Sequence, residues 1–293
     1  MKQGHSAIAQ FFIAFLIGIL VLAIPFSFAL FRFAGNRMTI HSQPESYYPQ
    51  SSDAITISVA LRENAKGNPN CILLCRIDPP SNAIRIAVIP PETMVEDAGK
   101  FDAVANVWKR EGASRAETAL ENALSVESDR WLDLTSDSLL KLSDVVGAID
   151  FTLDSSLSLA NGLSALPQGR QIIDGRRAAI LINYRGYAAG EQDRLKMVGD
   201  LTEQMLMQRM PLMTESLLVK AFETAVNSGY SNLAVGDFES RRRALTHMLS
   251  RSLSVEILPV KGEYNEGKNT FLPSAETLEI LSETFGKKIN SIQ

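Results

Sequence analysis

A small set of charged side chains lies beside turn and loop residues and could together bind an anion. Glu92 follows two prolines after the alternating apolar segment "AIRIAVI", and Arg185 follows the apolar segment "AAILINY". Glu191 and Arg194 are three residues apart in "EQDR", where we expect Arg194 to open a helix. Helix N-termini attract anions, and a planar guanidinium donates two parallel hydrogen bonds to phosphate. The alternative, that these are ordinary solvated surface charges, stays open on spacing alone.

Patterns for other kinds of catalysis are not readable in the chain. His5 and His41 fall in the predicted tail and linker, and His247 stands alone in a predicted helix. No Ser-His-Asp arrangement, HExxH, P-loop or GxGxxG motif can be identified. The net charge of −4 offers no basic surface of the kind that follows a phosphate backbone, so we do not expect a nucleic-acid partner.

The two cysteines look at first like a redox or metal pair. Cys71 and Cys75 lie in "CILLCRI", which the apolar run predicts to be a buried strand. On a strand such residues share a face but lie about 13 Å apart, beyond the roughly 7 Å that a disulfide tolerates. We therefore expect two buried free thiols.

Strands that alternate with helices predict a mixed α/β domain that positions these residues. Strands are expected at 55–63, 71–77, 84–89, 130–134, 148–153 and 255–260, with a hairpin around Pro79 and Pro80. Helices are expected at 101–111, from a capping box at 114–117 onward, at 135–147, 175–184, 194–210, 212–229, 237–252 and 274–285. Residues 155–169 have the composition of a loop. This order predicts helices on both faces of a partly parallel sheet.

A long apolar run precedes that domain. Residues 11–31, "FFIAFLIGILVLAIPFSFALF", contain no charge and are long enough to cross a bilayer as one helix. A cleaved signal peptide is the alternative, but the run exceeds the usual signal core of about 7–15 residues. We expect a cytoplasmic tail at 1–10, a membrane helix at 11–31, a linker at 32–53, an extracytoplasmic domain at 54–286 and a C-terminal tail at 287–293. The flanking charges are nearly balanced, so the orientation rests on segment lengths and on the resemblance below.

Several short motifs occur in an order that resembles one protein family. "IPPET" (89–93) stands where that family has Ile-Pro-Arg-Asp-Thr, and "LPQGRQIIDGRRA" (166–178) matches its Leu-x-x-Gly-x-x-x-x-Asp-Gly-x-x-Ala. "KFDAVANVWKREGA", "LINYR" and "EQDR" match further motifs in the same order. From about residue 54 to residue 286 the chain thus resembles the LytR-CpsA-Psr family of cell-envelope proteins.

The resemblance implies both a fold and an activity. Members carry a short cytoplasmic tail, one membrane helix and an external α/β domain with a mixed central sheet sandwiched by helices. Active members resemble phosphotransferases that move glycopolymers from a polyprenyl-pyrophosphate carrier onto peptidoglycan. Aspartates hold Mg²⁺, arginines neutralise the pyrophosphate, and an apolar tunnel takes the lipid. The partners implied here are the membrane, an isoprenoid lipid or polyprenyl-linked glycopolymer, and peptidoglycan.

Several motif positions depart from the family pattern. The first aspartate position is Asn70, the signature arginine and aspartate are Pro91 and Glu92, and the first arginine of a pair is Asn183. Glu191 replaces another aspartate. An amide is a poorer ligand than a carboxylate for a hard cation, and proline fixes φ and lacks an N–H.

The retained residues still map onto functional positions. The resemblance implies phosphate binding by Lys100, Arg185 and Arg194, catalysis by Arg185, Arg194 and Glu92, and a weak Mg²⁺ site at Glu92 and Asn70. Two functions therefore stay open. The chain is either an active transferase or pyrophosphatase, or a divergent module that binds the lipid-linked glycopolymer without chemistry. We favour the binding module slightly, because the charge losses fall at the motif positions.

Overall fold

The computed structural model describes residues 47–158, 164–265 and 267–286. The predicted tail and membrane helix lie outside these residues, as do most of the predicted linker and the C-terminal tail. No helix within the described ranges has the length and apolar character needed to cross a membrane. The described chain opens with a short 3-10 helix, η1 (Ser51–Asp53), where the Tyr47 hydroxyl donates to the Asp53 carboxylate at 2.6 Å.

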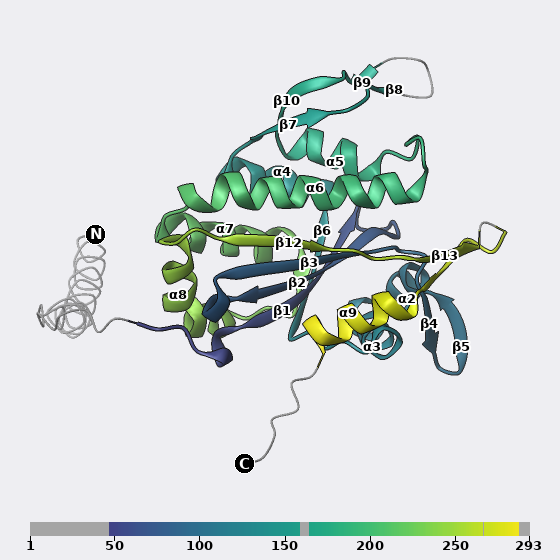
Figure 1. Ribbon diagram of the computed structural model, residues 1–293, viewed down its shortest axis with the longest axis horizontal. Helices are drawn as coiled ribbons and strands as arrows, with labels where there is room; N and C mark the ends of the chain where they lie inside the picture. Colours follow the sequence, from purple (N-terminus) through teal and green to yellow (C-terminus); the bar gives the residue numbers. More distant parts are fainter. Residues whose placement is uncertain (1–46, 159–163, 266, 287–293) are drawn as a thin grey trace, which may run out of the picture. The chain divides into compact units, whose positions relative to one another are not determined.

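A six-stranded mixed sheet forms the centre of the domain (Figure 1), as the sequence predicts. Two of its neighbouring pairs, β1 with β6 and β3 with β12, are parallel, and the other three are antiparallel. Their order across the sheet is β11 (Tyr230–Ser231), β6 (Arg130–Thr135), β1 (Ile55–Arg62), β2 (Pro69–Asp78), β3 (Ala83–Ile89) and β12 (Ser254–Leu258).

Alternation along the strands divides the core into two layers. Ala60, Ile72 and Ala87 are fully buried against one group of helices, whereas Cys71, Leu73 and Ile86 face the other group. The first group comprises α2 (Val104–Glu111), α3 (Ala113–Leu124) and α9 (Ala275–Phe285). The second comprises α4 (Ser136–Val146), α5 (Gly175–Asn183), α6 (Glu191–Arg209), α7 (Glu215–Ser228) and α8 (Val235–Leu249). Helices therefore cover both faces, which confirms the predicted sandwich.

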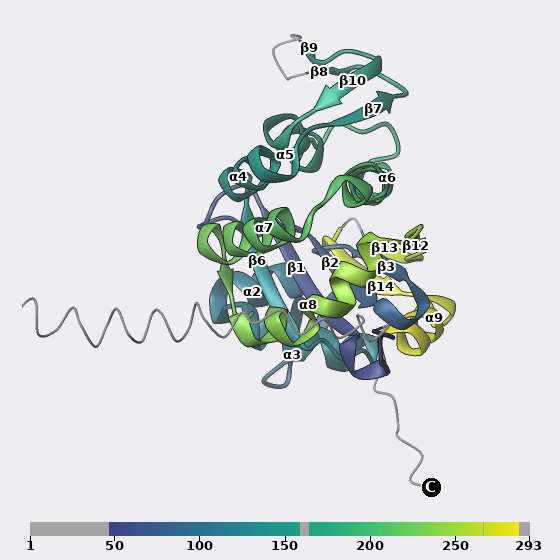
Figure 2. The ribbon, with the colours of Figure 1, turned by 90° about the vertical axis from the view of Figure 1, so that its left-hand side faces the viewer.

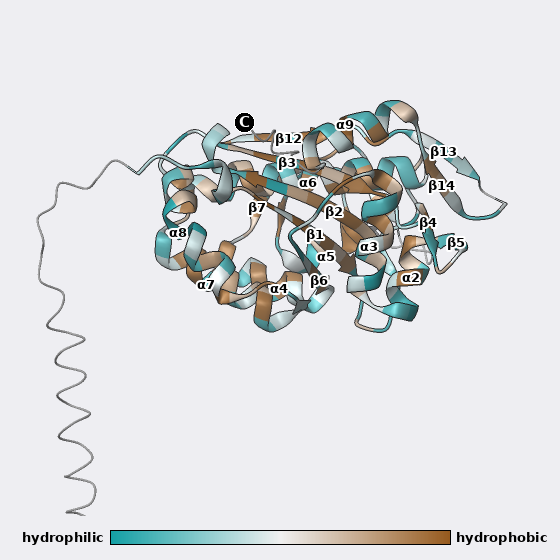
Figure 3. Cartoon of the chain, turned by 90° about the horizontal axis from the view of Figure 1, so that it is seen from below, coloured by the Kyte–Doolittle hydropathy of each residue, from teal (hydrophilic) through white to brown (hydrophobic). Residues whose placement is uncertain are grey.

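The second layer covers the sheet less completely than the first. Ile57, Val59, Ile77, Val255 and Ile257 pack against its core but remain partly exposed. None of the residues of α7 is buried. Figure 3 shows that the strands facing this layer are strongly hydrophobic. The domain thus has an apolar sheet face that its own helices leave partly accessible.

Some predicted element boundaries were wrong. The helix expected from residue 101 begins at Val104, because Lys100–Ala103 form β5 and pair with β4 (Met94–Asp97). The capping box at Ser114 is not formed, and α3 begins one residue earlier at Ala113. Its acidic member, Glu117, accepts a hydrogen bond from the Ser128 hydroxyl instead of reaching back to the helix start.

Besides the β4–β5 hairpin, three two-stranded pairs among the described residues lie outside the central sheet. The strand predicted at 148–153 exists as β7 (Ile149–Leu153), but it pairs with β10 (Gly169–Ile173). The predicted loop at 155–169 contains β8 (Leu157–Ser158) and β9 (Ser164–Leu166), which Figure 2 shows beyond α5, away from the sheet. The third hairpin joins β13 (Gly262–Asn265) to β14 (Thr270–Pro273).

The two cysteines are free, as the sequence predicts. Both lie on β2 and contribute to the core layer beneath α4–α8, with Cys71 buried and Cys75 partly buried. Burial raises the pKa of each thiol to about 12. Neither thiol is therefore suited to redox or metal chemistry near neutral pH.

Candidate functional site

The first turn of α6 joins two arginines through one carboxylate. Arg194 Nε donates to Glu191 Oε2 at 2.8 Å, and its Nη2 contacts Glu191 Oε1. Arg185, which follows the C-terminus of α5, donates from Nη1 to the same Glu191 Oε2 at 3.0 Å. The structure therefore brings together three of the residues that the sequence singles out.

The Arg194 side chain is buried and forms its hydrogen bonds within the protein. It is 0% exposed, and it also donates to the carbonyl oxygens of Ile182, at 3.0 Å, and Asn70. These contacts use four of the five N–H donors of the guanidinium. The helix begins at Glu191 rather than at Arg194, so the expected arrangement, a side chain at the helix start facing an anion, is not observed. Arg194 ties α6 to α5 and β2.

Arg185 is the accessible cation of the cluster. Its side chain is 51% exposed, and Nη2 donates to Asn70 Oδ1 at 2.8 Å. The guanidinium thus bridges Glu191 and Asn70 while much of it faces solvent. Arg185 is the better placed of the two arginines to meet a ligand.

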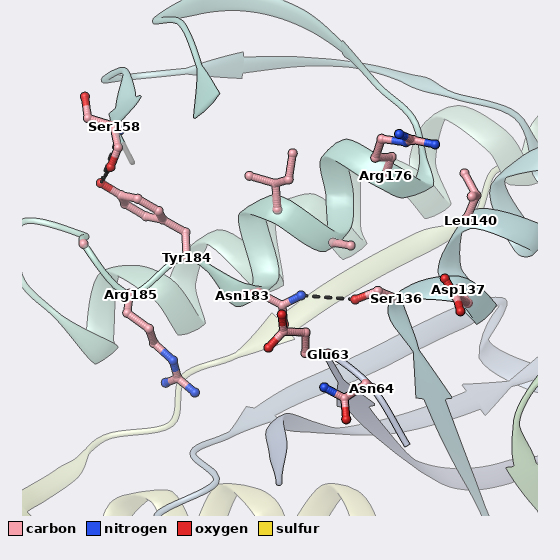
Figure 4. A pocket seen from close by; sticks show the side chains of 13 residues that line it. Glu63, Asn64, Ser136, Asp137, Leu140, Ser158, Arg176, Asn183, Tyr184 and Arg185 are labelled. Carbon is pink, nitrogen blue, oxygen red and sulfur yellow. Dashed lines mark hydrogen bonds between the residues drawn. The ribbon is translucent and has the colours of Figure 1, made fainter. Parts of the chain in front are cut away.

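Two substituted motif positions are in direct contact. Asn70, on β2, donates from its side-chain amide to Asn183 Oδ1 at the end of α5. Asn183 in turn donates to the Ser136 hydroxyl at 3.2 Å, at the start of α4 (Figure 4). The resemblance assigns these two positions to an aspartate and an arginine. A neutral amide pair therefore stands where the family pattern has opposite charges.

Glu92 lies in the turn after β3, where the two prolines stop the strand. The Thr93 hydroxyl donates to the Pro90 carbonyl at 2.7 Å, and the Glu92 carbonyl accepts from Phe271 N–H at 2.8 Å. Glu92 Oε2 is buried and has no hydrogen-bond partner among the described residues. Burial, together with the charge of Glu191, raises the pKa of this carboxyl. The neighbouring Pro91 supplies neither a charge nor an N–H.

Lys100 is not brought into the cluster. It is exposed at the start of β5, in the turn of the β4–β5 hairpin. It lies about 10 Å along the strand from Ala103, which lines the nearer pocket. The predicted phosphate-binding role of Lys100 gains no support from this position.

Two hollows meet at Arg185. The larger, of about 970 Å³, lies between α4, α5 and the β1–β2 connection (Figure 4). Its lining includes Glu63, Asn64, Ser136, Asp137, Leu140, Ser158, Arg176, Ala179, Ile180, Asn183, Tyr184, Arg185 and Gly186. The smaller, of about 320 Å³, is lined by Asn68, Pro69, Pro91, Glu92, Ala103, Ala105, Asn106, Arg185 and Asn269. Asn68 and Asn269 lie outside the quoted motifs and carry no sequence signal, whereas Asn106 lies within "KFDAVANVWKREGA" without being one of its predicted site residues.

The charges of the cluster balance. Arg185 and Arg194 contribute two positive charges, and Glu191 and Glu92 contribute two negative charges when ionised. The described residues contain no group of three histidine, cysteine or acidic side chains that could hold a metal. Asn70 Oδ1 and both Glu191 oxygens already accept hydrogen bonds, which leaves the Glu92 carboxylate as the candidate ligand among these groups. Mg²⁺ prefers carboxylates and octahedral geometry, so this donor set fits it poorly.

Comparison with known proteins identifies one family by sequence. The sequence model of the LytR_cpsA_psr family matches residues 45–287. No curated protein matches the sequence.

Solved structures share the fold at low sequence identity. A protein from Eubacterium siraeum DSM 15702, described as a transcription regulator, has a TM-score of 0.74 at 13% identity over 83% of this chain and 95% of its own. TagV from B. subtilis has a TM-score of 0.63 at 17% identity, covering 79% and 95%. TagT bound to LIIa-WTA has a TM-score of 0.63 at 14% identity, covering 82% and 92%.

Proposed function

Because the chain belongs to the LytR-CpsA-Psr family, we propose that it is a cell-envelope protein that binds a polyprenyl-linked glycopolymer without transferring it efficiently. The observation that carries the proposal is the neutral pairing of Asn70 with Asn183 beside two arginines that share Glu191. The domain has a large hollow beside these residues, whereas the guanidinium groups of Arg185 and Arg194 are largely engaged in contacts within the protein.

The glycopolymer is proposed from fold similarity and from the size of the larger hollow. TagT, which shares the fold, has been solved bound to LIIa-WTA. A hollow of about 970 Å³ is at the upper end of the roughly 300–1,000 Å³ usual for ligand pockets. Arg185 lies at its edge, where its exposed guanidinium would bind the phosphate groups of the carrier.

The isoprenoid is proposed to lie on the partly accessible sheet face. Ile57, Val59 and Ile257 remain partly exposed there, although they lie on strands of the main sheet that helices cover. A long hydrocarbon would remove this apolar surface from water, at about 25 cal/mol per Å². Met197 also packs against this layer, and its flexible thioether suits a chain-like ligand as well as ordinary core packing.

Weak or absent catalysis follows from the charges. A pyrophosphate leaving group needs positive charge arranged around it in advance. Here Arg194 is buried and bonded to protein groups, and Arg185 is paired with the Glu191 carboxylate. Pro91 carries no positive charge. The carrier would therefore be held but not strongly activated.

We also propose a single-pass location in the cell membrane. The apolar run at 11–31 would anchor the chain, with 1–10 as a cytoplasmic tail and 32–53 as the linker. The domain at 54–286 would then face the outside, where lipid-linked glycopolymers and peptidoglycan meet, and 287–293 would form a short tail.

The alternative function is an active phosphotransferase onto peptidoglycan, or a pyrophosphatase on the carrier. The unpartnered Glu92 Oε2 beside Arg185 favours it, since a buried carboxylate could share a Mg²⁺ with substrate phosphates. The raised pKa of Glu92 works against this role, because a protonated carboxyl is a poor metal ligand.

Native mass spectrometry of the full chain, extracted from its own membranes in mild detergent, tests the binding function. We expect an isoprenoid-containing molecule to co-purify. Val59→Gln should lower its occupancy severalfold by placing an amide on the apolar face, whereas Val235→Gln, at an exposed site on α8, should not. Absence of any isoprenoid from the wild-type protein would contradict the proposal.

A further inference from the structure

The smaller hollow is lined by amides more than by charges. Asn68, Asn106 and Asn269 reach it from the β1–β2 connection, α2 and the β13–β14 connection. We propose that this hollow binds an uncharged sugar residue of a glycan through these three side chains. The inference rests on the proposed function, because the sugar would belong to the glycopolymer held at Arg185.

Hydrogen bonds between the side chains hold two of the amides in place. Asn68 Nδ2 donates to Asn106 Oδ1 at 3.2 Å, and Asn106 Nδ2 donates to Asp102 Oδ1 at 2.8 Å. An amide group both donates and accepts, as do the hydroxyl and acetamido groups of sugars. Phosphate offers acceptors and is bound best by charged donors, so neutral amides suit it less well.

The charges around the hollow also favour an uncharged ligand. Among the described residues that line it, Arg185 is the one cation, and its guanidinium already contacts Glu191 and Asn70. The facing Glu92 carboxyl would repel an anion when ionised. When protonated, the same group can donate a hydrogen bond to a hydroxyl. In either form, the Glu92 carboxyl that lines the hollow can form a hydrogen bond with a sugar hydroxyl.

The size and walls of the hollow fit one sugar ring. Its volume of about 320 Å³ is at the small end of the range for ligand pockets, roughly 300–1,000 Å³. Pro69, Pro91, Ala103 and Ala105 form part of its walls and bring no charge to it. The substitution of the signature arginine by Pro91 thus replaces a charge with an apolar surface at this hollow.

Binding of two probes to the full chain in detergent tests the inference. The first probe is chitotetraose, an uncharged tetramer of N-acetylglucosamine, and the second is inorganic pyrophosphate. Asn68→Ala and Asn269→Gly should each weaken chitotetraose binding about five- to tenfold, the loss of roughly one hydrogen bond. Glycine is chosen at 269 because Asn269 has a φ of 50°, which glycine adopts without strain. Asn122→Ala, at an exposed site on α3, is the matched control and should change nothing.

The two probes should respond to different residues. We expect pyrophosphate binding to fall with Arg185→Ala and to be unaffected by the two asparagine variants. Chitotetraose binding that survives both asparagine variants, or that is absent from the wild type, would overturn the sugar site. Co-purification of the isoprenoid, measured on the same samples, reports separately on the proposed function.

Discussion

The side-chain amide of Asn70 donates a hydrogen bond to the side-chain carbonyl of Asn183. This contact joins β2 to the end of α5 at two positions that the family pattern gives to an aspartate and an arginine. The two substitutions are therefore complementary, since together they replace a pair of opposite charges with a pair of neutral amides. A buried or half-buried charge without its partner is strongly destabilising, whereas a neutral pair is tolerated.

Restoring the charges one at a time should reveal this complementarity. We expect Asn183→Arg to lower the free energy of unfolding by about 1–2 kcal/mol, because it breaks the amide pair, and Asn70→Asp to lower it by less, because Arg185 already donates to this position. The double variant should recover much of the loss, with a coupling energy of about 1–3 kcal/mol. Urea unfolding of the full chain in detergent measures all four proteins. Strictly additive effects would mean that the two side chains do not interact.

The two arginines of the cluster should differ in what their removal damages. Arg194→Met leaves Glu191 without its buried partner and should lower the free energy of unfolding by about 3–5 kcal/mol. Arg185→Met removes a half-exposed contact and should lower it by less than about 1 kcal/mol, while weakening pyrophosphate binding. Thermal unfolding and pyrophosphate titration distinguish the two effects. Equal destabilisation by both variants would contradict the assignment of Arg194 to the fold and Arg185 to the ligand.

A buried carboxyl far from the site should make stability depend on pH. Burial raises the pKa of Glu117 from 4.5 to about 7, with the charge of Glu121 adding to the effect and the Ser128 hydrogen bond opposing it. Between these values the native state keeps a proton that the unfolded chain releases, so stability falls as the pH rises. Glu117→Gln should raise the free energy of unfolding at pH 8 by roughly 2–3 kcal/mol and leave it unchanged near pH 4.

The matched control for Glu117 is an exposed glutamate nearby. Glu127→Gln makes the same chemical change on the surface and should shift stability little at either pH. Unfolding followed at several pH values measures both variants. A Glu117→Gln profile that runs parallel to the wild type would show that this carboxyl does not titrate between pH 4.5 and 7.

Close packing of α5 on α4 should depend on one glycine. A Cβ at Gly175 would lie 2.4 Å from the Leu139 carbonyl oxygen and 2.6 Å from the Leu140 Cα, so α5 would have to move. Gly175→Ala should therefore lower the free energy of unfolding by about 1–3 kcal/mol. It should also displace Asn183 and Arg185, which lie at the other end of α5 and just beyond it.

A second helical glycine provides the comparison. Gly236, in the first turn of α8, has open space where a Cβ would lie, so Gly236→Ala should be neutral or stabilising by up to about 1 kcal/mol. Thermal unfolding of both variants measures the difference. Equal effects of the two alanines would mean that the α4–α5 contact is not tight.

The periodicity of the sequence was sufficient to predict the layers but not every strand partner. Alternation in β1 and β3, the apolar run in β2 and the proline turn at 79–80 predicted these strands and the hairpin. The same alternation in β7 could not show that its partner is β10, because pairing depends on contacts that a local pattern does not encode. The capping box failed for a similar reason, since Glu117 found a tertiary partner in Ser128.

The candidate site was predicted unevenly. The motif order identified Asn70, Asn183, Arg185, Glu191 and Arg194, and the structure brings these five together. Spacing could not show that Arg194 is buried, because its partners come from α5 and β2, far away in the sequence. The asparagines of the smaller hollow were missed, since Asn68 and Asn269 are single polar residues in connections without a periodic signature, and Asn106 resembles any other exposed residue of α2.

Turnover of the carrier tests the central proposal most directly. The full-length protein in detergent is incubated with a polyprenyl pyrophosphate and Mg²⁺, and both the released phosphate and the retained lipid are quantified. We predict that the lipid is retained and that phosphate release does not exceed the background without protein. Release that depends on Mg²⁺ and disappears in Glu92→Gln or Arg185→Ala would contradict a binding module and identify an active enzyme.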